Sequence, residues 1–338
     1  MLAERLTAQL LSGSRARNPV RVAERLLAVQ GQDPKGARLA VRVRSEGLHA
    51  SDVDRALTHD RSLLITWLNR GTLHLVRSED YAWLHALTTP PLFTGNARRL
   101  RQEGVDAAAA ERGVAAVERA LAEEGPLTRA ELADRVAAQN VRTEGQALVH
   151  VLMLACLRGV AIRGPMAGRH HAYVLVRDWL GEPERVDRGE ALAELARRYL
   201  AGHGPADDRD LAKWVGLPLR DARAGLDAIA SECVEREDGL LDLKGRKPAA
   251  DLPPPRLLGP YDPLLLGWRS REALLGSHAD VVTTNGLFRP IALVRGRAVG
   301  TWGMPGGKVA LEPFGRLARA DATALAQEAR DVTRFMDA

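Results

Sequence analysis

Two glutamines separated by one residue are the side chains of this chain best placed to act together chemically. Gln30 and Gln32 come just before Asp33 and Pro34. Pro34 disfavours the helical conformation at Asp33, so the backbone is expected to be extended there. Side chains at i and i+2 share a face in extended backbone, which brings the two amides to one point beside a carboxylate. Two neutral amides can hold a water molecule or a base edge without adding a fixed charge.

The sequence signals a helix immediately before this segment. Asn18 is a favoured N-cap residue and Pro19 a favoured first helical residue. Val22, Leu26 and Val29 then recur at helical spacing on one apolar stripe. The sequence therefore predicts a helix from Pro19 that gives way to extended chain at the glutamines.

Composition excludes several classes of protein. The 338 residues, 46 % of them hydrophobic, allow two or three domains, and the net charge of +5 favours a polyanionic partner. Cys156 and Cys233 lie far apart in apolar surroundings, which argues against a cysteine zinc cluster and against a disulfide. The longest apolar run, Val149–Leu157, is too short to cross a membrane, and the first residues lack a secretory region. We expect a soluble, cytoplasmic protein that does not use a membrane.

One local pattern, two helices followed by a hairpin, occurs three times, and its third copy is the clearest. A helix from Asp208 is stopped by Gly216, and a second helix starts at Pro218. The Asp238-Gly239 dipeptide then predicts a hairpin between strands at 233–237 and 240–243. Two helices, a short turn and a hairpin together predict a winged helix.

The other two copies are read from capping and strand signals. In the second, capping boxes at Thr128 with Glu131 and at Thr143 with Gln146 start two helices. Its wing strands are predicted at 160–163 and 173–176, with a loop between them that contains Arg163, Arg169, His170 and His171. The first copy uses the helix from Pro19, a segment at 51–57, and strands at 63–67 and 72–76 around a turn at 69–71.

The predicted secondary-structure pattern changes after Lys244. A basic, proline-rich linker is followed by predicted strands and a last helix, at 281–284, 290–294, 298–302, 308–311 and 317–335. The fold class predicted is α+β, predominantly α: three tandem winged-helix modules and a small C-terminal β-rich module. Their predicted bounds are 1–90, 91–180, 181–247 and 248–338.

Three segments resemble the bacterial winged-helix DNA glycosylases of the AlkZ and YcaQ type. The first is Val29-Gln30-Gly31-Gln32-Asp33-Pro34, similar to the family's Gln-x-Gln element. The second is Ile65–Val76, which holds the Arg-Gly-Thr-Leu-His core. The third combines Tyr261-Asp262 and Trp268–Arg271 with Asn285–Phe288 and Val299–Trp302. These segments occur in the family's order and span most of the chain.

The resemblance implies a C-shaped protein whose basic concave face grips double-stranded DNA as a monomer. It implies monofunctional hydrolysis of the N-glycosidic bond of N7-alkylated purines, with unhooking of interstrand crosslinks in some relatives, and no metal or cofactor. It assigns catalysis to Gln30 and Gln32. Gln32 places the chain with the AlkZ type, because relatives of the YcaQ type carry Asp there. Gly31 departs from the family, in which this residue more often has a side chain, and is expected to hold the amides less firmly.

The chemistry agrees with this assignment. An N7-alkylpurine is cationic and already a good leaving group, so the remaining barrier lies in an oxocarbenium-like sugar and the delivery of water to it. Asp33 is the alternative catalytic group, because amides are weak bases, although it also suits a turn before proline. No local motif suggests Schiff-base chemistry by lysine, so lyase activity is not expected.

Candidate DNA contacts lie on the wings and on the C-terminal turn. Arg70 and His74 on the first wing are expected near phosphate, with a packed strand histidine as the alternative for His74. Arg169, His170 and His171 on the second wing are expected to follow the DNA backbone, or else to be a solvated loop. By resemblance, the turn with Asn285, Phe288 and Arg289 probes the minor groove; the alternative is an ordinary tight turn. Asp262 and Arg271 are expected to form a structural ion pair.

A protein of another class remains possible from the sequence: a non-catalytic winged-helix DNA binder, either a regulator or a structural protein. Such a regulator usually dimerises to read two half-sites. The chain shows no heptad segment for dimerisation. Three modules in series favour a clamp on one duplex, so the glycosylase is the preferred interpretation.

Overall fold

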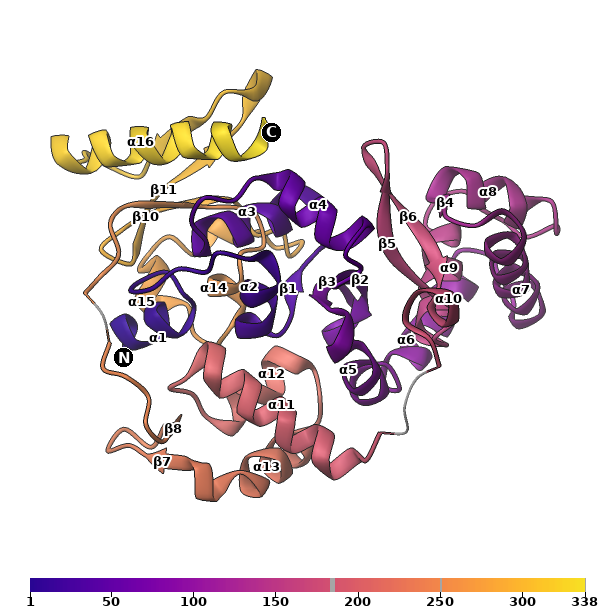
Figure 1. Ribbon diagram of the computed structural model, residues 1–338, viewed down its shortest axis with the longest axis horizontal. Helices are drawn as coiled ribbons and strands as arrows, with labels where there is room; N and C mark the ends of the chain where they lie inside the picture. The colour runs from indigo at the N-terminus through magenta and orange to yellow at the C-terminus, as the bar shows by residue number, and fades with distance from the viewer. Residues whose placement is uncertain (183–185, 250, 338) are drawn as a thin grey trace. The chain divides into compact units, whose positions relative to one another are not determined.

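The computed structural model describes residues 1–182, 186–249 and 251–337, which form two compact units (Figure 1). The first unit contains Met1–Val53 and Leu192–Ala338, and the second contains Asp54–Ala191. Both are mixtures of helices and small antiparallel sheets, with helix the more abundant element. The general class predicted from the sequence is therefore confirmed. The division into four modules stays a prediction.

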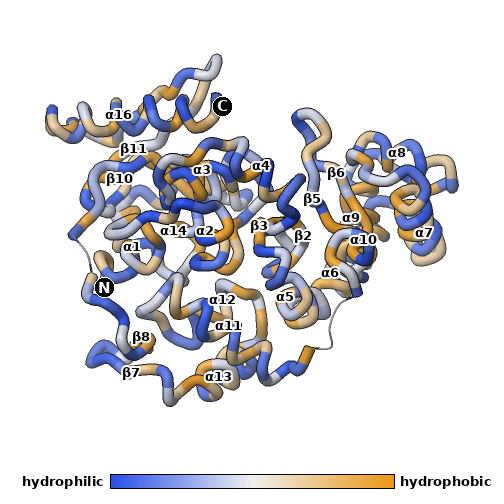
Figure 2. The backbone as a smooth tube through the Cα atoms, in the orientation of Figure 1, coloured by the Kyte–Doolittle hydropathy of each residue, from blue (hydrophilic) through white to orange (hydrophobic). Residues whose placement is uncertain are grey.

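The second unit is built around a helix that is apolar on all sides. Nine of the eleven residues of α9 (Ala147–Leu157) are buried, and Figure 2 shows the hydrophobic colour running along it. A helix of this kind forms the centre of a core. The other helices of the unit are α5 (Tyr81–Thr88), α6 (Leu92–Gln102), α7 (Ala107–Glu124), α8 (Arg129–Ala137) and α10 (Val176–Leu180).

Within this unit, five antiparallel strands are paired in the order β3, β2, β5, β6, β4. Their bounds are β2 (Leu63–Leu68), β3 (Thr72–Arg77), β4 (Leu127–Thr128), β5 (Ala161–Ala167) and β6 (His170–Leu175). On β2, Ile65 lies opposite Leu75 of β3 and Arg163 of β5. The register of β5 shifts between Arg163 and Met166, where Pro165 has no N–H to donate to a ladder.

The predicted starts of the helices in this unit are partly confirmed. Thr128 and Glu131 form the capping box at the start of α8. The box predicted at Thr143 and Gln146 is wrong, because α9 begins after Gln146 with no side-chain cap. Burial of its apolar residues stabilises α9 without that cap. The first hairpin is confirmed, since β2 and β3 join through a 3₁₀ turn, η1 (Asn69–Gly71).

The second predicted wing loop is too long. Arg163 lies in β5, His170 and His171 lie in β6, and only 168–169 form the turn between the two strands. Short polar stretches are typical of loops, but here β5 and β6 stay paired as far as Ala167 and His170, the residues next to the turn. Burial of His171, which is 4 % exposed, agrees with a strand rather than a loop.

The first unit contains most of the remaining helices. They are α1 (Leu2–Ala8), α2 (Pro19–Leu26), α3 (Pro34–Arg44), α12 (Asp208–Val215), α13 (Leu219–Ala228), α14 (Pro263–Leu266), α15 (Glu272–Leu275) and α16 (Arg319–Met336). Two more, α4 (Ala50–Thr58) and α11 (Arg188–His203), begin in one unit and end in the other. Gly216 ends α12, as predicted, and adopts the left-handed conformation. The hairpin of β7 (Cys233–Glu235) and β8 (Leu241–Leu243) follows α12 and α13, also as predicted.

A four-stranded sheet and α16 form the C-terminal part. The sheet has the order β12, β11, β10, β9, with β9 (Arg256–Leu258), β10 (Ile291–Val294), β11 (Arg297–Gly303) and β12 (Ala310–Pro313). The helix α16 packs against it through Leu325 and Val332, which join Trp302 in one buried cluster (Figure 1). The sequence predicted β10, β11, β12 and α16 and missed β9. The strand predicted at 281–284 is wrong: this segment is a 3₁₀ turn, η4 (Ala279–Val281), followed by a single bridge between Val282 and Phe288.

Within the part of the chain that the structure describes, no helix is both long and apolar enough to cross a membrane.

Candidate active site

The two glutamines meet directly. The helix α2 begins at Pro19 under the Asn18 cap and ends at Leu26, so Val29 belongs to β1 (Val29–Gln30) and not to the predicted helical stripe. Nε2 of Gln30 donates to Oε1 of Gln32 at 2.5 Å. Gln30 is buried, whereas Gln32 is exposed. The predicted convergence of the amides is confirmed, with one amide held inside the protein and the other displayed at the surface.

The remaining polar atoms of this pair have complementary roles. The mutual hydrogen bond uses one amide hydrogen of Gln30 and one lone pair of Gln32. Oε1 of Gln30 can still accept a hydrogen bond, and Nε2 of Gln32 can still donate two. A water molecule needs both kinds of partner to be oriented. The pair can therefore hold water or a base edge, but neither amide is a strong base.

Asp33 caps the next helix. Its Oδ1 accepts from the backbone N–H of Gly36 at 2.7 Å, at the start of α3, where Pro34 is the first residue. The sequence did not predict α3. The negative charge of a carboxylate at a helix N-terminus interacts favourably with the helix dipole. Asp33 is thus first of all a structural cap beside the glutamines.

The segment Pro260-Tyr261 packs against the start of α3. A Cβ atom on Gly36 would lie 2.5 Å from the carbonyl oxygen of Pro260, so only glycine fits there. Burial raises the pKa of Tyr261, and the negative charge of Asp33 raises it further. Tyr261 is a site residue that the sequence reasoning did not single out. Its only signal was its place in one of the segments that carry the family resemblance.

Tyr261 connects the glutamine segment with the turn at 283–288. Its backbone N–H donates to the carbonyl of Phe288, and the two ring centroids are 5.8 Å apart. The Arg271 guanidinium lies 5.1 Å from the centre of the Phe288 ring. Phe288 is half-buried by these neighbours. These contacts of Phe288 hold the turn at 283–288 against Tyr261 and Arg271.

Leu287 follows the tip of this turn and is 54 % exposed. Gly286 has a φ of 74°, and the N–H of Thr283 donates to the carbonyl of Leu287 at 2.9 Å. Asn285 and Arg289 are exposed on either side. A large exposed apolar residue between polar neighbours is the arrangement used by side chains that wedge between bases. From the sequence, Phe288 was expected in this role, and Leu287 was not predicted.

The expected Asp262–Arg271 ion pair is wrong. Both carboxylate oxygens of Asp262 accept from Arg44 of α3, at 2.7 and 2.9 Å, and both residues are fully buried. Arg271 instead donates Nε to the carbonyl of Leu265. The Arg44–Asp262 pair fixes α3 to the segment that carries Tyr261.

The first-wing residues differ in accessibility. Arg70 is exposed in η1 with a φ of 58°. His74 is only 2 % exposed, and its Nδ1 lies 2.9 Å from the carbonyl oxygen of Thr72. Burial, and then the charge of Arg70, lowers the pKa of His74 to about 3. His74 is therefore neutral near pH 7 and corresponds to the packed strand histidine.

Asn69, next to Arg70, is a third site residue that was not predicted from the sequence. It is fully buried, and neither amide atom has a hydrogen-bond partner among the described residues. Buried polar groups without partners are uncommon and often belong to functional sites. On the second wing, Arg169 and His170 are exposed and His171 is buried.

No group of three or more His, Cys, Asp or Glu side chains in the described ranges is arranged to hold a metal ion.

Comparisons with known proteins give matches over nearly the whole chain. The family described as DNA glycosylase AlkZ-like matches residues 23–335. The interstrand DNA cross-link repair glycosylase of Streptomyces sahachiroi is 29 % identical over 347 residues, covering 93 % of this chain and 89 % of that protein. The solved structure of the Streptomyces sahachiroi DNA glycosylase AlkZ superposes with a TM-score of 0.78 at 25 % identity, covering 99 % of this chain and 95 % of that one.

Proposed function

The chain belongs to the AlkZ-like DNA glycosylase family, and we propose that it hydrolyses the N-glycosidic bond of N7-alkylated purines in double-stranded DNA. It is a DNA glycosylase, a hydrolase of N-glycosyl bonds. The observation that carries the substrate class is the uncharged pair Gln30 and Gln32, joined at 2.5 Å. A site without a strong acid or base suits a leaving group that needs no protonation, and a purine made cationic at N7 is such a group.

In the proposed mechanism, the bond to the cationic base breaks and leaves an oxocarbenium-like sugar. Oε1 of Gln30 accepts a hydrogen bond from the attacking water, while an N–H of Gln32 donates to the same water. The base leaves as a neutral molecule with the electron pair of the broken bond, the water oxygen bonds to C1′ of the sugar, and the proton that the water loses passes to solvent. The positive charge of the sugar is stabilised by the amide oxygens and by the carboxylate of Asp33. Asp33 acts mainly through its charge, because its Oδ1 is occupied by the cap on α3.

The name of the Streptomyces relative describes it as an interstrand cross-link repair glycosylase. We extend that substrate to this chain: a crosslink through N7 of two purines presents the same cationic leaving group. The exposed Leu287, flanked by Asn285 and Arg289, supports the displaced DNA near such a lesion.

For DNA binding, we propose three winged-helix modules at 1–90, 91–180 and 181–247, and a C-terminal module at 248–338. Exposed Arg70, Arg169 and His170 contact phosphates on the wings. Buried His74 and His171 pack within their strands and do not reach DNA. We propose that the protein acts as a monomer in the cytoplasm, without a metal or cofactor. The C-shaped arrangement implied by the resemblance stays a prediction.

The test is a glycosylase assay with purified protein on two duplexes. One carries a single N7-methylguanine, and the other carries a nitrogen-mustard-type crosslink between two guanines. We expect release of the free base and unhooking of the crosslink, with an abasic site and no strand cleavage until alkali is added. Tight binding to both duplexes without base release would contradict the proposal and would favour a non-catalytic DNA binder.

A further inference from the structure

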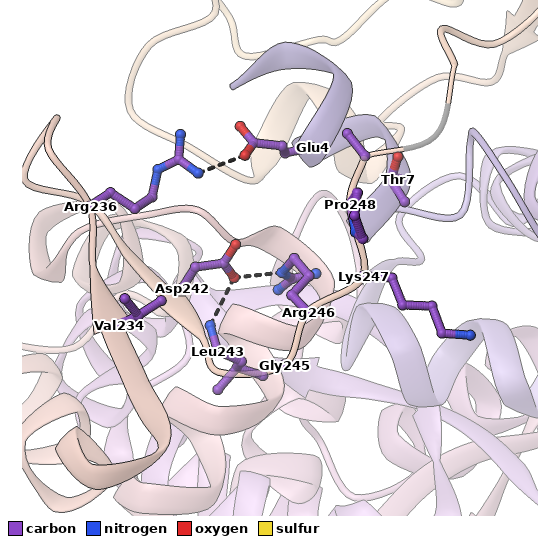
Figure 3. Close-up of a pocket in the computed structure, with 11 residues that line it drawn as sticks. Glu4, Thr7, Val234, Arg236, Asp242, Leu243, Gly245, Arg246, Lys247 and Pro248 are labelled. Carbon is purple, nitrogen blue, oxygen red and sulfur yellow. Dashed lines mark hydrogen bonds and ion pairs between the residues drawn. The ribbon is translucent and has the colours of Figure 1, made fainter.

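A row of adjoining pockets runs along the first unit, separate in its lining residues from the glutamine site. The first pocket, of about 230 Å³, is shown in Figure 3. Four of its five charged side chains are paired: Glu4 lies 2.6 Å from Arg236, and Asp242 lies 2.5 Å from Arg246. The fifth charged side chain, Lys247, gives this first pocket one excess positive charge.

The second pocket, of about 440 Å³, shares Gly245, Arg246 and Lys247 with the first. Its lining contains four cationic side chains, from Arg25, Lys244, Arg246 and Lys247, and no carboxylate among the described residues. Figure 3 shows the Lys247 side chain extending away from the Asp242–Arg246 pair. Positive charge therefore accumulates in the middle pocket.

Two guanidinium groups are held close together there. Arg25 and Arg246 both donate to the carbonyl oxygen of Ala201, at 3.1 and 3.3 Å. Burial lowers the pKa of Arg25, and the charge of Arg246 lowers it further. Like charges repel each other, Asp242 offsets part of the charge of Arg246, and an anion bound at the two guanidinium groups relieves the remaining repulsion.

A buried hydroxyl is an independent sign of a ligand. Ser12 lines the same pocket, and its residue is only 5 % exposed. Its Oγ is buried and has no hydrogen-bond partner within the described part of the chain. Such a group normally bonds to protein, water or ligand. A hydroxyl and two guanidinium groups that line one pocket are a donor set that suits a phosphate oxygen.

The third pocket, of about 670 Å³, continues the row and shares Leu10, Ser14, Arg25 and Ala201 with the second. Five arginines and one glutamate line it: Arg15, Arg17, Arg21, Arg25, Arg198 and Glu24. A row of cationic pockets matches an anion that repeats along a chain. A DNA strand has that property, with one phosphate per ~3.4 Å of helix axis.

We propose that these three pockets, the basic groove, bind the phosphodiester backbone of a nucleic-acid strand outside the catalytic glutamines, with one phosphate held by Ser12, Arg25 and Arg246. The groove deepens the proposed function and rests on it, because it supplies a second hold on the DNA that the enzyme repairs. Lys244 and Lys247 contribute charge at its surface.

The test compares two double variants that each remove two positive charges. Lys244→Gln with Lys247→Gln changes the groove, and Lys213→Gln with Lys308→Gln is the matched control, since both control lysines are exposed and line none of these pockets. Binding to lesion-free duplex is measured by fluorescence anisotropy from low to moderate salt. We expect the groove variant to bind about tenfold more weakly and to lose about 2 from the slope of log affinity against log salt, with the control unchanged.

Ser12→Ala tests the phosphate site without changing charge. We expect about 2- to 10-fold weaker binding with an unchanged salt slope. Equal slopes for the two double variants would overturn the proposal. The Tm of the wild type is also measured in inorganic phosphate and in chloride at equal ionic strength. A higher Tm in phosphate, together with normal DNA binding by the groove variant, would overturn the assignment to a nucleic-acid strand. Base release by the wild type is measured separately, so a failure of the proposed function is distinguished from a failure of the groove.

Discussion

Replacing Leu287 by Ala tests whether the C-terminal turn holds damaged DNA. Complete burial of a leucine side chain stabilises a complex by roughly 1.5–3 kcal/mol. Leu287 is 54 % exposed, so about half of that burial, roughly 0.8–1.6 kcal/mol, remains to be gained when DNA covers it. The variant should therefore lose about 4- to 15-fold in unhooking of a crosslink, which needs the duplex held open. Excision of N7-methylguanine needs less distortion and should fall by less than about twofold.

The assay measures single-turnover excision of both substrates by Leu287→Ala and by Leu252→Ala. Leu252 is the matched control, because it is 44 % exposed and lies outside the turn. Neither change should alter the Tm appreciably, since both side chains are surface residues about half exposed to solvent. Equal losses on the two substrates, or the same loss in the control, would refute the wedge role of Leu287.

Three further predictions concern residues around the site. Asp262→Asn leaves the buried Arg44 without its charge partner, so we expect a loss of about 3–5 kcal/mol in the free energy of unfolding, measured by urea titration; a loss below about 1 kcal/mol would contradict the pair's role. Asp33→Asn keeps the cap on α3 and removes the charge, so excision should stay within about tenfold of wild type; a loss beyond ~10²-fold would make Asp33 the base. His74 has a pKa of about 3 in the folded protein and about 6.5 when unfolded, so the unfolded chain takes up the additional proton between these values. Its contribution to stability is complete above pH ~6.5 and falls by up to ~1.4 kcal/mol per pH unit as the pH drops toward 3. His74→Gln should reduce that slope in urea midpoints between pH 7 and pH 5, and an unchanged slope would contradict this prediction.

Local signals in the sequence predicted much of the fold. The Asn18 cap, the Thr128 capping box, the Gly216 stop and the Asp238-Gly239 turn each act within a few residues, and all are present in the structure. The convergence of Gln30 and Gln32 was equally local, because it depends only on extended backbone between neighbours.

The wrong predictions concern features that are set by tertiary packing rather than by local sequence. The helix α9 starts without the expected Thr143 box because nearly all of it is buried. The strand expected at 281–284 has β-branched residues but makes only one bridge, because the turn after it closes too soon. Asp262 finds Arg44 at a sequence separation of 218 residues, and spacing along the chain gives no sign of such a pairing. Leu287 was missed because exposure is a property of the folded turn.

The central claim is that Gln30 and Gln32 perform the chemistry, and the double variant Gln30→Ala with Gln32→Ala tests it most directly. Single-turnover release of N7-methylguanine is compared with that of the wild type and of Gln327→Ala, a control at an exposed position of α16. We expect the double variant to lose about 10²–10⁴-fold in rate while DNA affinity stays within about twofold, the scale for removing groups that position a reacting water. Excision at the wild-type rate would contradict the account and would place the active site elsewhere in the chain.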